Sequence, residues 1–179
     1  MRYLAILLLV CSGALANAQG TSIKTIKPSK EEAEFIHAFF FDLLEPRGDT
    51  TYKYSTKIAS KLLRELPDIF TRDTIGLRIV NGKRRLAERF LVLTPEEKAH
   101  IKAGYAEFGH LKWDDNILPE EKRLSMSDAV GMNITKPIFL RNNTLCIFEY
   151  DWSKEAALAI FKKVEGKWTI HIILITMHV

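Results

Sequence analysis

Cysteine is scarce in this sequence, which has only two, Cys11 and Cys146. Cys11 lies in an N-terminal segment that we expect to be removed, so the mature chain would keep Cys146 alone. An internal disulfide is then excluded, even in an oxidising compartment. Stability must come from a hydrophobic core, and a chain of this length hides roughly 70% of its unfolded surface on folding.

Common catalytic and metal-binding motifs are missing as well. The sequence contains no H-E-x-x-H, no paired C-x-x-C, no glycine-rich phosphate loop and no G-x-S-x-G. His171 and His178 would lie on opposite faces of one predicted strand, so they cannot share a metal ion. We therefore predict neither a metal nor a cofactor. The sequence favours a non-enzymatic protein without deciding the question.

A strong excess of charge of one sign is absent too. The formal net charge is +4 at pH 7, which is too small to indicate a nucleic-acid partner. A small ligand or another protein of the cell envelope is the partner that the sequence leaves open.

Long hydrophobic runs are absent except near the N-terminus, where Tyr3–Val10 is apolar. That run follows Arg2 and precedes Ala16 and Ala18, which fit an export signal with a small-x-small cleavage site. We predict a signal peptide over residues 1–18 that is cleaved after Ala18, or alternatively after Ala16. An uncleaved anchor and a lipoprotein are the other interpretations. The mature protein would be secreted or periplasmic, with no transmembrane segment.

Hydrophobic periodicity divides the rest of the chain into helices and strands. A flexible arm is predicted over residues 19–28, and an extended surface excursion over 111–131. Capping boxes and an Asn-Gly hairpin turn at residues 81–82 mark several boundaries. The predicted helices run from Ser29 to the break at Pro46, from Thr56 to Leu66 and from Thr94 to near Gly109, and the predicted strands span 75–80, 83–93, 137–140, 144–151, 156–164 and 167–177.

The order ααββαββββ separates helices from antiparallel strands, which indicates an α+β fold. We predict a single domain over residues 29–179, with three helices packed on one face of a curved antiparallel sheet of about six strands. In the last hairpin, a two-residue turn would pair Phe161 with Ile170 and Ala159 with Ile172. The final strand is apolar on both sides near its end, so it would be central in the sheet.

Two resemblances bear on this fold. Residues 94–179 resemble a group of uncharacterised secreted bacterial proteins of the Bacteroidetes type. The matching motifs are Leu93-Thr94-Pro95-Glu96-Glu97-Lys98, Trp113, Thr135-Lys136-Pro137-Ile138-Phe139, Cys146-Ile147-Phe148, Ile160-Phe161-Lys162-Lys163 and Gly166-Lys167-Trp168. The order of the elements, together with Phe39-Phe40 to Gly48-Asp49, is similar to the NTF2-like cone fold. That fold hosts ligand-binding proteins, hydrolases and isomerases, so the resemblance implies no single function.

His37 is the candidate catalytic residue. It lies on the predicted apolar stripe of the first helix, near Ala33 and Phe40, and in a cone-like fold that face would line a pocket. A buried imidazole could act there as an acid or a base. A core histidine that bonds to a backbone carbonyl is the commoner role of such a residue.

Trp113 and Asp114 form one candidate binding surface. An aromatic ring beside a carboxylate suits a sugar or a cation, although a solvated turn is the commoner use of such residues. Cys146, in contrast, is predicted to be buried and unreactive, because no activating base can be identified for it.

A basic hairpin end is the second candidate surface. It would suit an anionic glycan or lipid headgroup, or it would only protect a strand edge from aggregation. Its residues are Arg78, Lys83, Arg84 and Arg85.

The sequence thus favours a secreted or periplasmic module that binds a ligand or a protein. The alternative is an NTF2-like small-molecule enzyme, a hydrolase or isomerase, that uses His37 in a pocket. A third class is a dimerisation or scaffold module that uses an open sheet face around Leu158, Ile160 and Ile173.

Overall fold

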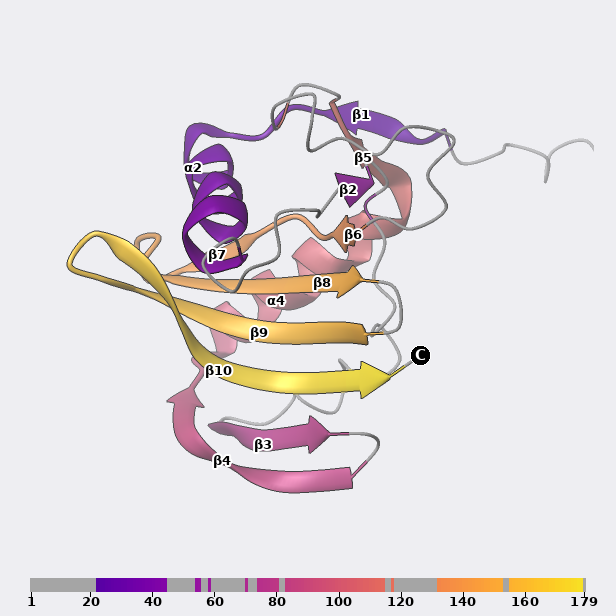
Figure 1. Cartoon of the computed structure of the whole chain (residues 1–179). Helices are drawn as coiled ribbons and strands as arrows, with labels where there is room; N and C mark the ends of the chain where they lie inside the picture. Colours follow the sequence, from indigo (N-terminus) through magenta and orange to yellow (C-terminus); the bar gives the residue numbers. More distant parts are fainter. Residues whose placement is uncertain are drawn as a thin grey trace, which may run out of the picture.

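Figure 1 shows a computed structural model of the chain. It describes residues 22–44, 54–55, 58, 70, 74–80, 83–114, 117, 132–152 and 155–178, and for 54–55, 76–80, 83–89, 152, 155 and 175–178 it describes the backbone alone. The predicted signal peptide, with Ala16 and Ala18, lies outside these residues. So does the predicted second helix, apart from Ile58, which is buried.

Capping boxes begin the two α-helices of the described residues, α2 (Lys30–Ala38) and α4 (Pro95–Glu107). Ser29 Oγ accepts a bond from the Glu32 backbone N–H, and Glu32 Oε2 accepts one from the Ser29 N–H, at 3.2 and 2.7 Å. Thr94 and Glu97 repeat this exchange at the start of α4. Each box satisfies backbone donors that a helix start leaves free, so both helix starts are confirmed. The π-helix η1 (Phe39–Leu44) continues α2, and the 3-10 helix η3 (Phe108–His110) continues α4.

The described strands form one large sheet and one small one. The large sheet has eight strands in the order β2-β6-β8-β9-β10-β3-β4, with β7 also paired to β8, and the small sheet joins β1 to β5 in parallel. The strands are β1 (Lys24–Ile26), β2 (Tyr54–Ser55), β3 (Thr74–Val80), β4 (Lys83–Val92), β5 (Leu111–Trp113), β6 (Met132–Ile134), β7 (Ile138–Leu140), β8 (Leu145–Trp152), β9 (Glu155–Val164) and β10 (Lys167–His178).

The α+β class is confirmed, but the predicted sheet is wrong in size and in direction. β10 pairs in parallel with β3, and β2 pairs in parallel with β6, so the sheet is mixed. The order of strands along a chain does not say which strands become neighbours, and strands of two or three residues carry too little pattern to be recognised. For the same reason, β1 lies within the predicted flexible arm and β5 begins the predicted surface excursion.

Two of the predicted turns between strands agree with the structure, and the third, Asn81-Gly82, lies outside the described residues. Glu165 and Gly166 join β9 to β10 with φ of 51° and 81°, the left-handed values that a two-residue hairpin turn requires. Arg141, Asn142 and Asn143 join β7 to β8, also at positive φ. Asparagine tolerates this region better than most residues, as expected for this loop.

The register of the last hairpin is correct only near its turn. Phe161 pairs with Ile170 as predicted. The register then shifts between Ile170 and Ile172, and Ala159 pairs with Ile173 instead of Ile172. A β-bulge inserts an extra residue that simple alternation cannot reveal. β10 does lie between β9 and β3, so its central position is confirmed.

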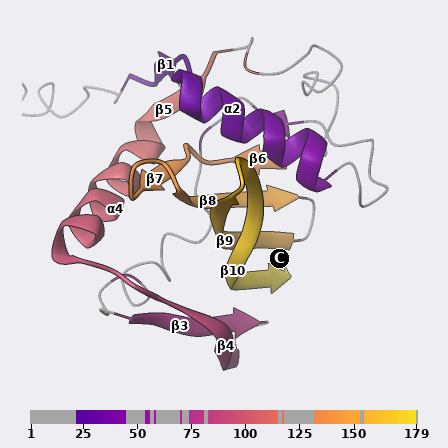
Figure 2. The same ribbon diagram turned by 90° about the vertical axis from the view of Figure 1, so that its left-hand side faces the viewer.

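The helices α2 and α4 cover opposite faces of the sheet, as Figures 1 and 2 show. Phe35 of α2 packs against Phe139 of β7, with ring centroids 6.0 Å apart. The residue before it, Ile138, lies against α4, where a Cβ atom on Gly104 would be 2.8 Å from Ile138 Cδ1. Adjacent residues of a strand point to opposite faces. The prediction that the helices share one face is therefore wrong, because an apolar stripe shows that a helix packs but not on which face.

Candidate functional site

The sheet face beneath α2 is filled by aromatic rings. The centroid of the Phe35 ring lies 5.0 Å from that of Phe148, 5.2 Å from that of Phe161 and 5.2 Å from that of Trp168. All three ring pairs are edge to face. Such pairs contribute about 0.5–1.5 kcal/mol each beyond the area that they bury. This face is therefore a packed core around Phe35.

His37 lies outside that core. Its side chain is exposed on α2, with the ring centroid 4.4 Å from that of Phe41. The buried side of the helix is centred on Phe35 and Ile36, one turn before the buried Phe39 and Phe40. The sequence predicted an apolar stripe that includes Ala33, but Ala33 is only half-buried. The prediction that His37 lies on the apolar face is wrong.

Trp113 and Asp114 do not form an exposed surface. Trp113 is fully buried, at 0% exposure, and Asp114 is half-buried. The Asp114 backbone N–H donates to the Ile26 carbonyl at 2.8 Å and so extends the pairing of β5 with β1. Because Leu111 and Trp113 alternate with the exposed Lys112, this short segment is a half-buried strand rather than a loop.

Buried polar side chains gather on β8, where sequence reasoning missed them. Glu149 and Asp151 are 1% and 3% exposed. Asp151 Oδ1 accepts bonds from the backbone N–H and the side-chain amide of Asn133, at 3.2 and 2.7 Å. Thr135 Oγ1 donates to the Glu149 carbonyl and accepts from the Glu149 N–H. The signal in the sequence was a pair of acidic residues, Glu149 and Asp151, two positions apart in an otherwise apolar predicted strand.

Tyr105 of α4 lies close to this polar group. Burial, and secondly the charge of Glu149, raise the pKa of the Tyr105 phenol well above its usual range. Among the described side chains, Tyr105 Oη and Trp113 Nε1 are the buried polar atoms that lack a hydrogen-bond partner. No cluster of three or more metal-ligating side chains occurs in this described part of the chain.

Cys146 is buried at 0% exposure, as predicted. Burial raises the pKa of its thiol well above the usual range. The thiolate is the reactive form of cysteine, so this environment keeps the side chain unreactive.

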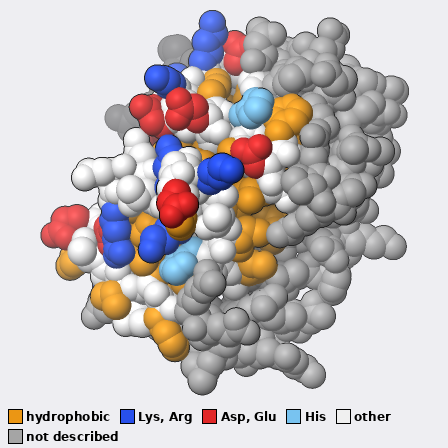
Figure 3. Space-filling view, turned by 60° about the vertical axis from the view of Figure 1, so that its left-hand side comes forward, with side chains coloured by type: hydrophobic (Ala, Val, Ile, Leu, Met, Phe, Trp, Pro, Cys, Tyr) orange, Lys and Arg blue, Asp and Glu red, His pale blue; other side chains and the backbone are white. Residues whose placement is uncertain are grey.

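Strand β4 is the last strand in the order of the large sheet (Figure 1). It carries two exposed apolar side chains. Phe90 is 59% exposed and Val92 is 61% exposed, whereas the alternate residues Leu91 and Leu93 are buried. Phe90 lies in a β-bulge, because Leu86 and Leu91 pair with β3 residues that are only two apart. Figure 3 shows hydrophobic side chains reaching the surface at the lower margin of the described part of one face.

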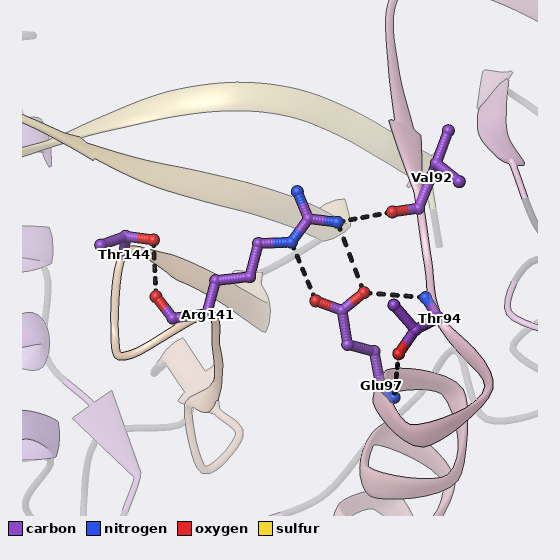
Figure 4. Close-up of polar contacts among 5 residues, drawn as sticks. All are labelled: Val92, Thr94, Glu97, Arg141 and Thr144. Carbon is purple, nitrogen blue, oxygen red and sulfur yellow. Dashed lines mark hydrogen bonds and ion pairs between the residues drawn. The ribbon is translucent and has the colours of Figure 1, made fainter.

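Arg141 fixes the end of β4 (Figure 4). Its guanidinium donates from Nη2 to the Val92 carbonyl and from Nε to Glu97 Oε1 at 2.8 Å. Glu97 is the carboxylate of the α4 capping box, so one side chain ties the β7–β8 turn to both β4 and α4. The bond from Arg141 lowers the pKa of Glu97. The backbone at Val92 is therefore tied to α4 and to the β7–β8 turn.

The β3–β4 pairing brings the predicted basic residues together at the turn end of that hairpin. Arg78 pairs with Arg85, Ile79 with Arg84, and Val80 with Lys83. Arg84, Arg85 and the exposed Phe90 thus lie on a single strand. Trp113 belongs to β5 of the other sheet and Asp114 directly follows that strand, so the two do not lie on β3 or β4.

Comparison with known proteins gives no match, whether to a family model, to a curated protein or to a solved structure. The two resemblances drawn from the sequence therefore stay predictions. In the part of the chain that the structure describes, no helix has both the length and the apolar composition needed to cross a membrane.

Proposed function

We propose that this protein is a secreted or periplasmic module that binds another protein through strand β4. The exposure of Phe90 and Val92, at 59% and 61%, carries the proposal. A large apolar side chain in water loses the stabilisation that burial would give, about 1.5–3 kcal/mol for Val or Phe. Two of them on one side of one strand form a surface suited to a partner.

The backbone of β4 supports the same function. In the described structure β4 pairs with β3 alone, and an edge strand offers a row of N–H and C=O groups to a further strand. Extended segments commonly bind by adding a strand to such an edge. Arg141 and the α4 capping box hold the end of β4 in place, which lowers the entropic cost of binding.

The rival functions receive less support. An NTF2-like enzyme that uses His37 would need this side chain in a cavity, whereas it is exposed. A dimerisation face around Leu158, Ile160 and Ile173 would need them at the surface, whereas Leu158 and Ile160 are 0% exposed and Ile173 is half-buried. The observations favour binding at the sheet edge over either alternative.

Site-specific crosslinking tests the proposal in the cells that produce the protein. A photoreactive phenylalanine analogue replaces Phe90 in one variant and Lys102, an exposed residue of α4, in a matched control. We expect a discrete protein adduct from position 90, weakened by Val92→Ser and absent from position 102. Equal adducts from both positions, or none from position 90, would contradict binding through β4.

Export is tested separately. The N-terminal residue of the protein purified from the cell exterior or the periplasm is expected to be Gln19. An intact N-terminus at Met1, or a protein retained in the cytoplasm, would contradict the predicted signal peptide and its cleavage after Ala18.

A further inference from the structure

We propose that the segment which binds β4 is acidic and extended, and that it adds to the sheet as a strand beside Lys83–Leu86. This inference rests on the proposed function and specifies the chemistry of the partner. It starts from the basic residues that the β3–β4 register places together.

The basic residues occupy three successive pairs at one end of the hairpin. Arg78 and Arg85 are directly paired, and like charges in directly opposite positions destabilise a sheet. Arg84 and Lys83 follow on the edge strand itself. Four basic residues at adjacent register positions favour a partner that carries carboxylates, so an acidic segment is the complementary partner.

The form of the partner follows from the backbone of β4. An added strand pairs with N–H and C=O groups on the side of β4 away from β3, where no described strand pairs, and a lipid headgroup cannot form such a continuous ladder. A second copy of this chain would bring the same excess of Lys and Arg to the contact, which charge repulsion disfavours. An extended acidic segment meets both requirements.

The bulge divides β4 into two parts with different chemistry. Lys83–Leu86 pairs regularly with β3, and beyond the bulge Phe90 and Val92 are exposed. A segment that pairs with the regular part would continue towards these two side chains. The partner should therefore combine acidic residues with aliphatic ones.

Three synthetic peptides of about twelve residues test this with the purified protein. In one, Glu alternates with Val; in the second, Lys alternates with Val; the third is the acidic peptide with a central proline, which cannot pair along its length. Binding is followed by fluorescence anisotropy, and hydrogen exchange reports protection of the β4 amides. We expect the acidic peptide alone to bind, to protect Lys83–Leu86 and to bind more weakly as salt rises.

Charge-reversal variants locate the contact. Arg84→Glu combined with Arg85→Glu should weaken binding of the acidic peptide by about tenfold or more. The matched control reverses Lys102 and Lys112, which are exposed elsewhere, and should bind normally. If the Arg84→Glu, Arg85→Glu variant does not fold, the salt dependence and the basic peptide still decide whether binding requires an acidic segment.

Several outcomes would overturn the inference. Equal binding of the acidic and basic peptides would show that the charge of the segment does not determine binding. Equal binding of the proline peptide would exclude strand addition. Failure of the acidic peptide to bind, or binding of the basic residues to phosphatidylglycerol vesicles instead, would also overturn it. In these cases the crosslink from position 90 still decides whether β4 binds a protein at all.

Discussion

Replacing Arg141 with methionine should destabilise the protein, because this side chain joins three elements. Methionine keeps the apolar part of the side chain and the residue's positive φ of 53°, so the change isolates the loss of the guanidinium. The lost interactions are the ion pair with Glu97, at 2.8 Å, and the bond to the Val92 carbonyl.

The magnitude follows from exposure. Arg141 is 44% exposed and Glu97 14%, so the ion pair lies near the upper end of the surface range, about 1 kcal/mol. The charged donor to a carbonyl contributes a further amount, reduced by water, and we expect a total of about 1–2 kcal/mol. For a chain of this size each kcal/mol lowers Tm by about 2–4 °C.

Urea unfolding of the variant at pH 7 gives the measurement, with an unchanged slope as the sign of a pure stability effect. Lys30→Met is the matched control, since Lys30 and Glu34 are 85% and 54% exposed in a 4.0 Å pair. Its loss should not exceed about 0.5 kcal/mol. A double-mutant cycle with Glu97→Gln should show that the Arg141 effect depends on the carboxylate.

The pH dependence gives an independent check. The folded-state pKa of Glu97 is lowered by the bond from Arg141. The stabilisation that the ionised Glu97 carboxylate contributes to folding is therefore fully present above the unfolded pKa of about 4.3. It is lost as pH falls through the lower folded pKa. The destabilisation by Arg141→Met should shrink between pH 5 and about pH 3. An equal loss at both ends of that range, or additivity with Glu97→Gln, would refute this account.

Three further changes test the packing. Gly104→Ala should lower the free energy of unfolding by about 1 kcal/mol, because the new Cβ would lie 2.8 Å from Ile138 Cδ1 and overpacking outweighs the gain in helix propensity. Gly109→Ala is the control, since a Cβ there would meet nothing within 4 Å, and it should be neutral or stabilising. Chemical denaturation measures both. Tyr105→Phe should leave stability unchanged or raise it by about 1 kcal/mol, since it removes a buried hydroxyl that lacks a partner, and a fall in Tm would show that the hydroxyl is bonded. Cys146 should react with a thiol reagent only as the protein unfolds, because it is 0% exposed, and rapid labelling without denaturant would contradict its burial.

Local patterns in the sequence were sufficient for local structure. The capping boxes at Ser29 and Thr94 place helix starts because the bonds that make them lie within four residues. Glu165-Gly166 places a hairpin turn because few residue pairs adopt its backbone angles. The burial of Cys146 follows from the apolar strand around it. Each of these predictions depends on residues that are close along the chain.

The candidate site needed the fold. The sequence showed that Lys83–Arg85 is basic, but not that β4 ends the described sheet or that Phe90 and Val92 are exposed at the other end of the same strand. A bulge changes which side chains face outward, and alternation alone does not place it. The sequence also misplaced His37, because an error of part of a turn moves a helix residue from the core to the surface.

Composition and short-range pattern thus determined the α+β class, the starts of α2 and α4, and the turns at Asn142-Asn143 and Glu165-Gly166. Tertiary structure decided that α2 and α4 cover opposite faces, that β10 pairs in parallel with β3, and that Trp113 is core. These features depend on contacts between segments far apart in the chain, where many pairings satisfy the same local pattern and only packing selects one. The place of β4 at the end of the described sheet is one of those features, so the proposed function also depends on the fold.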